Sequence, residues 1–481
     1  MSEADYPTKE SVIRRAQELV DARITFGELD FSGRLSAKNK GDLGQIVEEG
    51  WYGYSPNNDA EPDFPEAGVE LKVSPYKLTR NGVSAKERLV CNIINYMDEV
   101  DKTFETSDFW YKCKCICLLS YRWNKNVDKA DMFVDHATLL DQYPIEDLLI
   151  IRDDWEKIVQ KIRLGEAHLL TEGDTNYLSA CTKGATAATS LKAQPYSPIL
   201  AKQRAYSFKT TYMTKLLRKY IFGEADDEHI IKDWRLLEHA CFDDIVIEMF
   251  MPFIGYTTRE IAFRFGMPWK DHYAKSVNAI VTRRILGLVG DPDRAEEFQN
   301  ANISVKTIVV NHNNRPEQNM SFPAFDFIDV LNQEWEDSDV YNQMVASRFL
   351  FVVFERDNLD QIPTLRNVFF WNMPTEDIEE LRKVWVKTRI AIRHGAGLRF
   401  DGTTVRNSLP KKTESYLAHV RPHSNRAAYI LSDGTVIGDP ERDANPLPDG
   451  QWMTTQCFWL NKEYIQNIIT QVYSGTEDET P

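Results

Sequence analysis

The sequence predicts an α/β protein in which one arrangement of helices and strands occurs twice. The chain has 481 residues, which is enough for two or more domains that each bury a core. Hydrophobic patterns with the period of a helix and with the period of a strand follow one another along it. Motifs of the first half also recur, in the same order, in the second half. We therefore expect two α/β domains, residues 1–222 and 231–481, joined by an acidic junction at residues 223–230.

The first half supplies the helical and strand patterns in turn. Apolar residues at positions 12, 16, 19 and 20 predict an amphipathic helix over 11–20, and a second helix is predicted over 41–50. Strict alternation of apolar and charged residues predicts a strand over 68–73. The same patterns predict a helix over 89–97 and a strand over 112–119.

Five segments of the second half match segments of the first half. In chain order, 275–283 matches 40–48, 297–306 matches 63–72, 335–354 matches 104–119, 421–424 matches 194–197, and 456–464 matches 204–212. One such match would be expected by chance, but five in the same order indicate an internal duplication.

The composition excludes several classes of protein. With 42% hydrophobic and 27% charged residues, the chain is typical of a globular protein. No apolar run approaches the ~18 residues needed to span a membrane, and the polar start (Met1 to Glu10) is no targeting peptide, so we expect a cytoplasmic protein. The chain has no GxSxG, Walker A, GxGxxG or HExxH motif, which argues against the corresponding hydrolase, nucleotide-binding and zinc-protease functions.

The net charge of −16 conceals a basic window between Cys181 and Tyr220. It contains eight basic residues and no acidic one: Lys183, Lys192, Lys202, Arg204, Lys209, Lys215, Arg218 and Lys219. Aromatic residues are interleaved with them, as in surfaces that bind polyanions such as nucleic acids. The alternative is a solvated cationic helix and loop.

Asp63 and the sequence Glu70-Leu71-Lys72 form the motif with the clearest chemistry. Hydrolysis of a phosphodiester needs a hard divalent cation held by carboxylates and a positive charge beside the developing transition state. Asp63 and Glu70 are placed to converge on one Mg²⁺, and Lys72 lies on the same face of the strand as Glu70. The alternative is that these are solvated surface charges.

The repeat distinguishes these two interpretations, because the second copy lacks the acids. Glu70 is replaced by Ser304 and Asp63 by Glu297, whereas Lys306 stands opposite Lys72. Glu48 is replaced by Thr282 or Arg283, depending on where one gap is placed. Solvated charges would give no reason for the halves to differ at these positions, so we expect a metal site in the first half and none in the second.

Several long motifs resemble one nuclease family. They are 40–48, 61–73, 84–96, 104–107, 181–184 and 202–209 in the first half, and 335–338, 419–423 and 452–453 in the second. These stretches are similar to the MutH mismatch-repair nicking endonuclease. They are more similar to the GATC-cutting type II restriction endonucleases of the Sau-three-A type, which share the two-copy layout.

This resemblance implies a PD-(D/E)xK nuclease fold, a mixed sheet flanked by helices, present as a catalytic and a degenerate copy. It implies that Asp63, Glu70 and the Leu71 carbonyl bind Mg²⁺, and that Lys72 positions or activates the water. Glu48 would complete the acidic cluster, with Glu49 as the alternative. Lys40 and Lys112 lie where the family has lysines near the cut phosphate.

The resemblance and the basic window together give the expected DNA contacts. In the first half they are Lys183, Lys192, Gln194, Tyr196, Arg204 and Lys209. Gln194-Pro195-Tyr196 stands in the base-reading loop where MutH has Arg-Pro-Lys, and Gln194 is expected to pair with adenine. In the degenerate half, which we expect to be DNA-binding or allosteric, Arg421, His423 and Lys306 are expected contacts, Arg348 takes the place of Lys112, and Trp459 is expected in the core.

The sequence therefore predicts a prokaryotic, Mg²⁺-dependent type II restriction endonuclease that cuts double-stranded DNA at a GATC-like site and leaves 5′-phosphates. A cognate DNA methyltransferase would complete the system without binding this chain. Because a palindrome has two scissile bonds, either two chains form a homodimer on the DNA or one chain cuts twice. Two alternatives remain open: a strand-specific nicking endonuclease of mismatch repair, and a non-catalytic sequence-specific DNA-binding protein.

Overall fold

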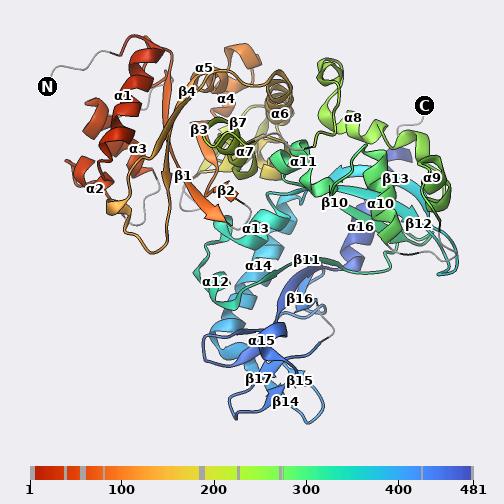
Figure 1. Cartoon of the computed structure of the whole chain (residues 1–481). Helices are drawn as coiled ribbons and strands as arrows, with labels where there is room; N and C mark the ends of the chain where they lie inside the picture. Colours follow the sequence, from red (N-terminus) through yellow and green to blue (C-terminus); the bar gives the residue numbers. More distant parts are fainter. Residues whose placement is uncertain are drawn as a thin grey trace. The chain divides into compact units, whose positions relative to one another are not determined.

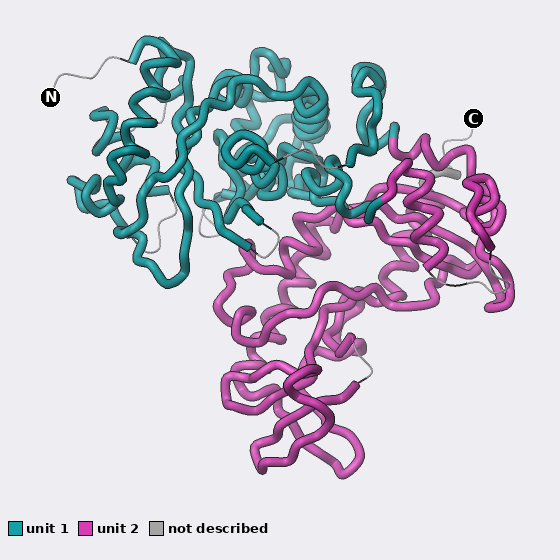
Figure 2. Tube along the Cα trace, in the orientation of Figure 1, with its two compact units in different colours: residues 1–245, 290–303 teal, residues 246–289, 304–481 magenta. Residues whose placement is uncertain are grey.

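The computed structural model describes residues 6–36, 41–54, 61–79, 82–183, 190–224, 228–269, 274, 276–423 and 426–477. The chain forms two compact units, which Figure 2 shows in different colours. Unit 1 comprises Met1–Ile245 and Gly290–Ile303, and unit 2 comprises Val246–Val289 and Ser304–Pro481.

The junction predicted at residues 223–230 lies inside unit 1 and does not divide the two units. Unit 1 also includes α11 (Glu296–Ala301), which belongs to the second half of the sequence. This helix packs on α7 (Thr210–Tyr220), where Thr211 Oγ1 donates to the Asn300 carbonyl over 2.8 Å and Lys215 forms an ion pair with Glu296. Tertiary packing therefore places the start of the second half in the first unit.

A mixed sheet forms the first layer of unit 1, in agreement with the predicted α/β class. Its strand order is β2 (Gly82–Ala85), β1 (Glu70–Thr79), β4 (Ile116–Arg122) and β5 (His136–Leu140). β1 pairs in parallel with β4, with Glu70 opposite Ile116, and the other two pairings are antiparallel. The strand predicted over 68–73 is thus confirmed as the start of β1.

Helices α1 (Lys9–Ala22) and α3 (Asp42–Val47) pack on this sheet (Figure 1). The predicted stripe on α1 is confirmed, since Val12, Ala16 and Leu19 are buried in one core with apolar residues of α3, β1 and β4. The Thr8 side chain caps α1 by accepting from the Ser11 N–H, which satisfies a backbone donor at the helix start.

A second sheet of unit 1 has the order β3 (Leu89–Ile93), β9 (Arg204–Phe208) and β6 (Leu178–Thr182). The helix predicted over 89–97 is wrong, because β3 pairs with β9 and only α4 (Tyr96–Glu99) is helical. Helices α6 (Ile145–Arg163) and α7 and the hairpin β7–β8 (Leu191–Gln194 and Ser197–Lys202) complete this part of unit 1.

The strand predicted over 112–119 begins later than expected. Cys113 ends α5 (Asp108–Cys113), and β4 starts only at Ile116. The helix forms because the Ser107 side chain accepts from the Trp110 N–H at its N-terminus. Cys113 and Cys117 are both buried, but they lie on different elements, α5 and β4.

Unit 2 is built on two three-stranded sheets. One has the order β10 (Ile303–Val310), β12 (Arg348–Glu355) and β13 (Thr364–Trp371). The other has the order β11 (Met320–Phe325), β21 (Gln456–Leu460) and β16 (Ala418–Pro422). Strand β12 falls in the segment 335–354 that matches 104–119, and it is buried along nearly its whole length.

The order of elements in the second half agrees with that in the first. A one-turn helix and a capping serine precede both α5 and α13 (Asp339–Met344), and Ser107 and Ser338 make the same hydrogen bonds. A 19-residue helix preceded by proline follows in each half, α6 and α14 (Thr375–Arg393). Each half then ends on a strand and a helix, β9 with α7 and β21 with α16 (Lys462–Glu477).

Shorter elements complete the described chain. The helices are α2 (Phe26–Leu29), α8 (Phe242–Glu248), α9 (Thr258–Arg264), α10 (Ser276–Ile285), α12 (Phe327–Asn332) and α15 (Pro440–Asp443). The strands are β14 (Arg399–Phe400), β15 (Val405–Arg406), β17 (Tyr429–Ile430), β18 (Val436–Ile437), β19 (Ala444–Pro446) and β20 (Trp452–Thr454). Within the described ranges, no helix combines the length and the apolarity that crossing a membrane requires.

Candidate active site

A tight turn brings Asp63 beside β1. The Phe64 N–H donates to the Val69 carbonyl over 2.9 Å, and the Val69 N–H donates back to the Phe64 carbonyl over 3.2 Å. Gly68 completes the turn with a φ of 64°, which glycine adopts without strain. As a result, Asp63 Oδ2 accepts a hydrogen bond of 2.8 Å from the Leu71 N–H. The Asp63 carboxylate thus lies next to the strand that carries Glu70.

Glu70 is buried between two lysines. Its side chain is about 3% exposed, and Oε1 lies 2.5 Å from Lys72 Nζ while Oε2 lies 3.6 Å from Lys112 Nζ. Lys72 stands two residues along β1, so its side chain points to the same side of the sheet. Although burial by itself lowers the pKa of Lys72, the negative charges of Glu70 and Asp63 raise it well above the usual value. Lys72 is therefore cationic at neutral pH.

Two acids of this cluster, Asp63 and Glu48, hold protons more tightly than usual. Burial, together with the charge of Glu70, raises the pKa of Asp63 to about 6. Burial and the charge of Asp63 raise the pKa of Glu48 to about 7. Because the charge of Glu70 raises the pKa of Asp63 and the charge of Asp63 raises that of Glu48, these acids share one electrostatic site, and such perturbed groups are typical of functional sites.

The structure brings Glu48 into this cluster and turns Glu49 away. Glu49 accepts hydrogen bonds from Ser32 (2.6 Å) and from Arg34 Nε (2.9 Å), on the outside of the fold. The helix that carries both acids continues beyond α3 as one π-helical turn, Glu48–Tyr52. Such a turn accommodates an extra residue in a helix, and π turns are frequent at functional sites.

The donor set of the cluster fits a hard divalent cation. Glu70 Oε2 is buried without a hydrogen-bond partner, and an unsatisfied carboxylate oxygen is a ligand that such a cation prefers. Within the described ranges, however, no three carboxylate, imidazole or thiol groups already meet around one point. The contact of Lys72 Nζ with Glu70 Oε1 accounts for this, because the ammonium lies where a cation would approach that oxygen.

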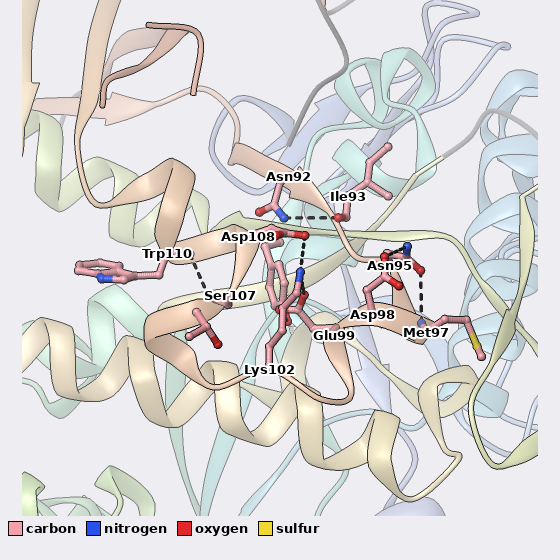
Figure 3. A network of polar contacts seen from close by, with 12 residues as sticks. Asn92, Ile93, Asn95, Met97, Asp98, Glu99, Lys102, Ser107, Asp108 and Trp110 are labelled. Carbon is pink, nitrogen blue, oxygen red and sulfur yellow. Dashed lines mark hydrogen bonds and ion pairs between the residues drawn. The ribbon is translucent and has the colours of Figure 1, made fainter. Parts of the chain in front are cut away.

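Helix α5 carries Lys112 in its last turn and is anchored at its start. Figure 3 shows the polar contacts there: Lys102 Nζ lies 2.7 Å from Asp108 Oδ2 and 3.9 Å from Glu99 Oε2. Ser107 caps the helix through the Trp110 N–H. Sequence reasoning missed this anchor, because a glutamate in a short helix gives no motif that distinguishes it from a solvated charge.

Three predicted DNA contacts lie at or near the hairpin β7–β8, and one predicted catalytic residue cannot be placed. Tyr196 is 76% exposed at the hairpin tip, with a left-handed φ of 59°. Lys192 is exposed and Lys183 is half-buried. Lys40 lies outside the described residues.

The structure corrects the prediction that Gln194 reads adenine. Gln194 is 5% exposed, and its Oε1 accepts from the Ala167 N–H over 2.7 Å. Its Nε2 donates to the Ile199 carbonyl over 2.6 Å and lies 3.0 Å from His168 Nδ1. Both ends of the amide are thus engaged within the protein. Gln194 fixes the hairpin to the segment behind it and presents no edge to a base.

Two basic residues of the window are also buried, contrary to the expectation that they contact DNA. Arg204 donates to the carbonyls of Ala180 (2.6 Å) and Leu170. Lys209 Nζ donates to the carbonyls of Thr175 (2.5 Å) and Ala301 (3.2 Å). Since buried carbonyls need donors, these cations serve the fold. The basic window therefore contributes fewer exposed charges than its sequence indicates.

In unit 2, Arg421 and His423 stack on Trp459. The Arg421 guanidinium lies 4.0 Å from the ring centroid, and the His423 ring lies 5.7 Å away at an interplanar angle of 25°. Arg421 and His423 are exposed and Trp459 is half-buried, so Trp459 is not the core residue that was expected. Arg348 is buried against Phe370, and Lys306 is half-buried near Phe322.

Comparisons with known proteins identify relatives of this chain. The family model "DNA mismatch repair enzyme MutH" matches residues 52–154, which include Asp63, Glu70, Lys72 and Lys112. The MutH proteins of Shigella flexneri serotype 5b and of Escherichia coli O139:H28 are each 28% identical over 220 residues, covering 44% of this chain and 93% of the relative.

The similarity to a restriction enzyme is higher and extends over both halves. The type II restriction enzyme Sau3AI of Staphylococcus aureus is 37% identical over 495 aligned residues. The alignment covers 96% of this chain and 99% of that enzyme. The resemblance predicted from the motifs is thus confirmed, including the greater similarity to the restriction enzymes than to MutH. The chain belongs to the family of the type II restriction enzyme Sau3AI.

Proposed function

We propose that this chain is a type II restriction endonuclease that hydrolyses phosphodiester bonds of double-stranded DNA at a GATC-like site, with Mg²⁺ as its cofactor. The observation that carries the proposal is the setting of Glu70. Its buried carboxylate lies between Lys72 and Lys112, next to Asp63, and one of its oxygens makes no hydrogen bond. Family membership supports the same reaction class.

Asp63, Glu70 and the Leu71 carbonyl would hold the metal, with Glu48 as a further acid. When bound, Mg²⁺ supplies a Lewis acid that neutralises charge on the scissile phosphate. Lys72, released from Glu70, would orient the attacking water and stabilise the charge that develops at phosphorus. Lys112 would contact the phosphate from α5. Because its pKa is about 7, Glu48 exchanges a proton readily at neutral pH. Departure of the 3′-oxygen leaves a 5′-phosphate.

The exposed residues of the hairpin would meet the DNA. Lys183 and Lys192 would contact phosphates, which set the register of the protein on the duplex, and Tyr196 at the tip would approach the base edges. Gly165 supports this arrangement, because a Cβ there would come within 2.9 Å of the Tyr196 carbonyl. Base reading would thus depend on the tip and not on Gln194.

We further propose that the two halves are duplicated nuclease domains, residues 1–222 catalytic and 231–481 degenerate. The shared order of strands and helices supports this, as does the matching serine cap of α5 and α13. The degenerate half would bind DNA or act allosterically, with Arg421, His423 and Lys306 among its contacts. Homodimer formation on DNA, action in the prokaryotic cytoplasm and a cognate methyltransferase that does not bind the chain remain predictions.

The two alternative functions have weaker support. The MutH relatives, which are named for mismatch repair, cover 44% of the chain, so a nicking endonuclease would leave the second half without a counterpart. A DNA-binding protein without catalysis would not need the buried Asp63, Glu70 and Lys72 cluster, whose unsatisfied carboxylate oxygen has a free-energy cost.

Digestion of DNA tests the proposal directly. Purified full-length protein is incubated with unmethylated plasmid in Mg²⁺ or in EDTA, and the ends are sequenced. We expect cuts at one tetranucleotide with 5′-phosphates in Mg²⁺, and binding without cleavage in EDTA. Cleavage on one strand only would favour the nicking enzyme, and binding without cleavage in both buffers would favour the non-catalytic protein.

A further inference from the structure

Glu99 is a buried acid outside the cluster around Glu70. Its side chain is about 2% exposed. Oε1 accepts two hydrogen bonds, from Trp155 Nε1 on α6 and from the Tyr206 hydroxyl on β9, each over 2.9 Å. A carboxylate that accepts from two different elements fixes their separation. Glu99 therefore joins α4, α6 and β9 within unit 1.

The other oxygen of Glu99 faces the start of α5. Figure 3 shows Lys102 between Glu99 and Asp108, with its Nζ 3.9 Å from Glu99 Oε2 and 2.7 Å from Asp108 Oδ2. Arg163 holds the same connection from α6, where it donates to the carbonyls of Val100 (3.0 Å) and Lys102 (2.9 Å). The connection between α4 and α5 is thus held by α6 through its backbone carbonyls, which accept from Arg163, and the Glu99 side chain before it accepts from Trp155 of α6.

Helix α5 transmits this anchor to the reaction site. It is one short helix, Asp108–Cys113, that begins at the residue held by Lys102 and ends beside Lys112. Phe109 of α5 packs on Tyr206, the same residue that donates to Glu99, with ring centroids 5.3 Å apart. Lys112 Nζ then lies 3.6 Å from Glu70 Oε2. A helix of this length is stable only through its tertiary contacts, so its position depends on them, and the anchor at its start is one of these contacts.

We propose that Glu99 is a positioning residue for cleavage: through Lys102 and Tyr206 it fixes α5, and α5 holds Lys112 beside Glu70 and the scissile phosphate. This inference rests on the proposed function, because it assigns Glu99 a part in that reaction. The negative charge is required, since Oε1 must accept two hydrogen bonds while Oε2 attracts Lys102. In Glu99→Gln one side of the group becomes an N–H₂ donor, which meets the Lys102 ammonium in one orientation and the Trp155 N–H in the other.

The test compares Glu99→Gln with the wild type in single-turnover cleavage and in DNA binding without metal. We expect a cleavage rate about 10- to 100-fold lower, because a small displacement of a catalytic group costs this much. DNA affinity is expected to change less than about twofold, since Glu99 is buried and contacts no DNA. Asp101→Asn is the matched control, because it removes an exposed carboxylate two residues away and should leave the rate unchanged.

A second substitution shows whether Glu99 acts through Lys112. If it does, Glu99→Gln should add almost no further loss to Lys112→Ala, since residues that act as one unit are not additive. Hydrogen exchange followed by mass spectrometry should show faster exchange of the α5 amides in Glu99→Gln and unchanged exchange in β1. If Glu99→Gln does not fold, Tyr206→Phe removes one donor only and should lower the rate in the same direction.

A wild-type rate in Glu99→Gln would overturn the inference, as would an equal loss of DNA affinity or a full further loss on the Lys112→Ala background. These outcomes differ from failure of the proposed function, in which the wild-type protein itself does not cleave DNA in Mg²⁺.

Discussion

Buried acids have opposite surroundings around Glu70 and at the matching positions of the second half. In the first half, burial raises the pKa of Asp63 to about 6, and Glu70 Oε2 has no hydrogen-bond partner. In the second half, the residue that matches Asp63 is Glu297, whose carboxylate accepts from the backbone N–H groups of Ile230 (2.9 Å) and Ile231 (3.1 Å). Although burial by itself raises its pKa, hydrogen bonds from His229 and from the backbone lower the pKa of Glu297.

The difference shows that two acids at matching positions of the two halves can differ in hydrogen bonding and in pKa. The Glu297 carboxylate accepts hydrogen bonds from the backbone and stabilises unit 1, whereas Glu70 keeps one carboxylate oxygen without a hydrogen-bond partner. Ser304 replaces Glu70, so no second carboxylate faces Lys306 from that position.

The largest expected effect comes from removing the acids of the first region. Glu70→Gln and Asp63→Asn should lower single-turnover cleavage at least about 1,000-fold, because each removes a carboxylate ligand of the proposed metal. Ser304→Ala, a change at the position that matches Glu70 in the second half, should leave the cleavage step nearly unchanged. Cleavage of a radiolabelled duplex measures both. Normal digestion by either acid variant would remove the site assignment.

The raised pKa values of the first region predict how the rate depends on pH. Asp63 and Glu48 must lose their protons before they bind a cation, and their pKa values are about 6 and about 7. At limiting Mg²⁺ we expect the cleavage rate to rise about tenfold or more between pH 5.5 and 7.5 and then to level off. Glu48→Gln should move the rise to lower pH. A flat profile over this range would contradict the raised pKa values.

Removing the charge of the buried acid should change the free energy of unfolding with opposite signs at Asp63 and at Glu297. A raised acid pKa makes the folded state bind more protons, so Asp63 destabilises the fold as pH rises from about 4 to 6. Asp63→Asn should therefore increase the free energy of unfolding by about 1–2 kcal/mol at pH 7.5 and by almost nothing below pH 4.

Glu297 has a lowered pKa, so its contribution is present above the unfolded value of about 4.5 and is lost as pH falls through the folded value. Glu297→Gln should decrease the free energy of unfolding by about 1–3 kcal/mol at pH 7.5, and by less at acid pH. Urea unfolding of both variants at the two pH values gives the comparison. The same sign in both would show that the two regions do not differ in this way.

The smallest expected effect concerns the exposed cations. Lys192→Ala and Arg421→Ala should each weaken DNA binding about threefold and lower the slope of log Kd against log salt by about 1. Arg204→Ala is the contrast, because Arg204 is buried and should lower the melting temperature instead. Fluorescence anisotropy at several salt concentrations measures the slopes. An unchanged slope for Arg421→Ala would remove it from the DNA contacts of the second half.

Much of the fold could be predicted from local patterns, and the errors have a common cause. Strand β1 and helix α1 follow from the periodicity of their own residues. The helix expected over 89–97 failed because Leu89 and Val90 pair with residues more than one hundred positions away in β9. Local periodicity does not report such partners, and an apolar run suits a helix and a strand equally well.

In the candidate site, too, some residues could be predicted from local patterns and others only from tertiary contacts. Asp63, Glu70 and Lys72 are close in sequence, so the strand period alone places Glu70 and Lys72 on one side. Lys112 comes shortly after the motif at 104–107, and the pairing of β1 with β4 brings it to Glu70. Gln194 carries no such signal: its side chain suits base reading, and only the contacts with Ala167 and Ile199 reveal its structural use.

The sequence by itself determined the α/β class, the acid–lysine motif and the family, because each depends on residues that are near one another or on long similar stretches. Only the tertiary structure decided which residues are available for chemistry. It placed Glu49 against Ser32 and Arg34, buried Gln194, Arg204 and Lys209, and tied α5 to Glu99 through Lys102. The reason is that burial and hydrogen-bond satisfaction depend on partners distant in the chain, and these fix whether a charged side chain supports the fold or remains free to react.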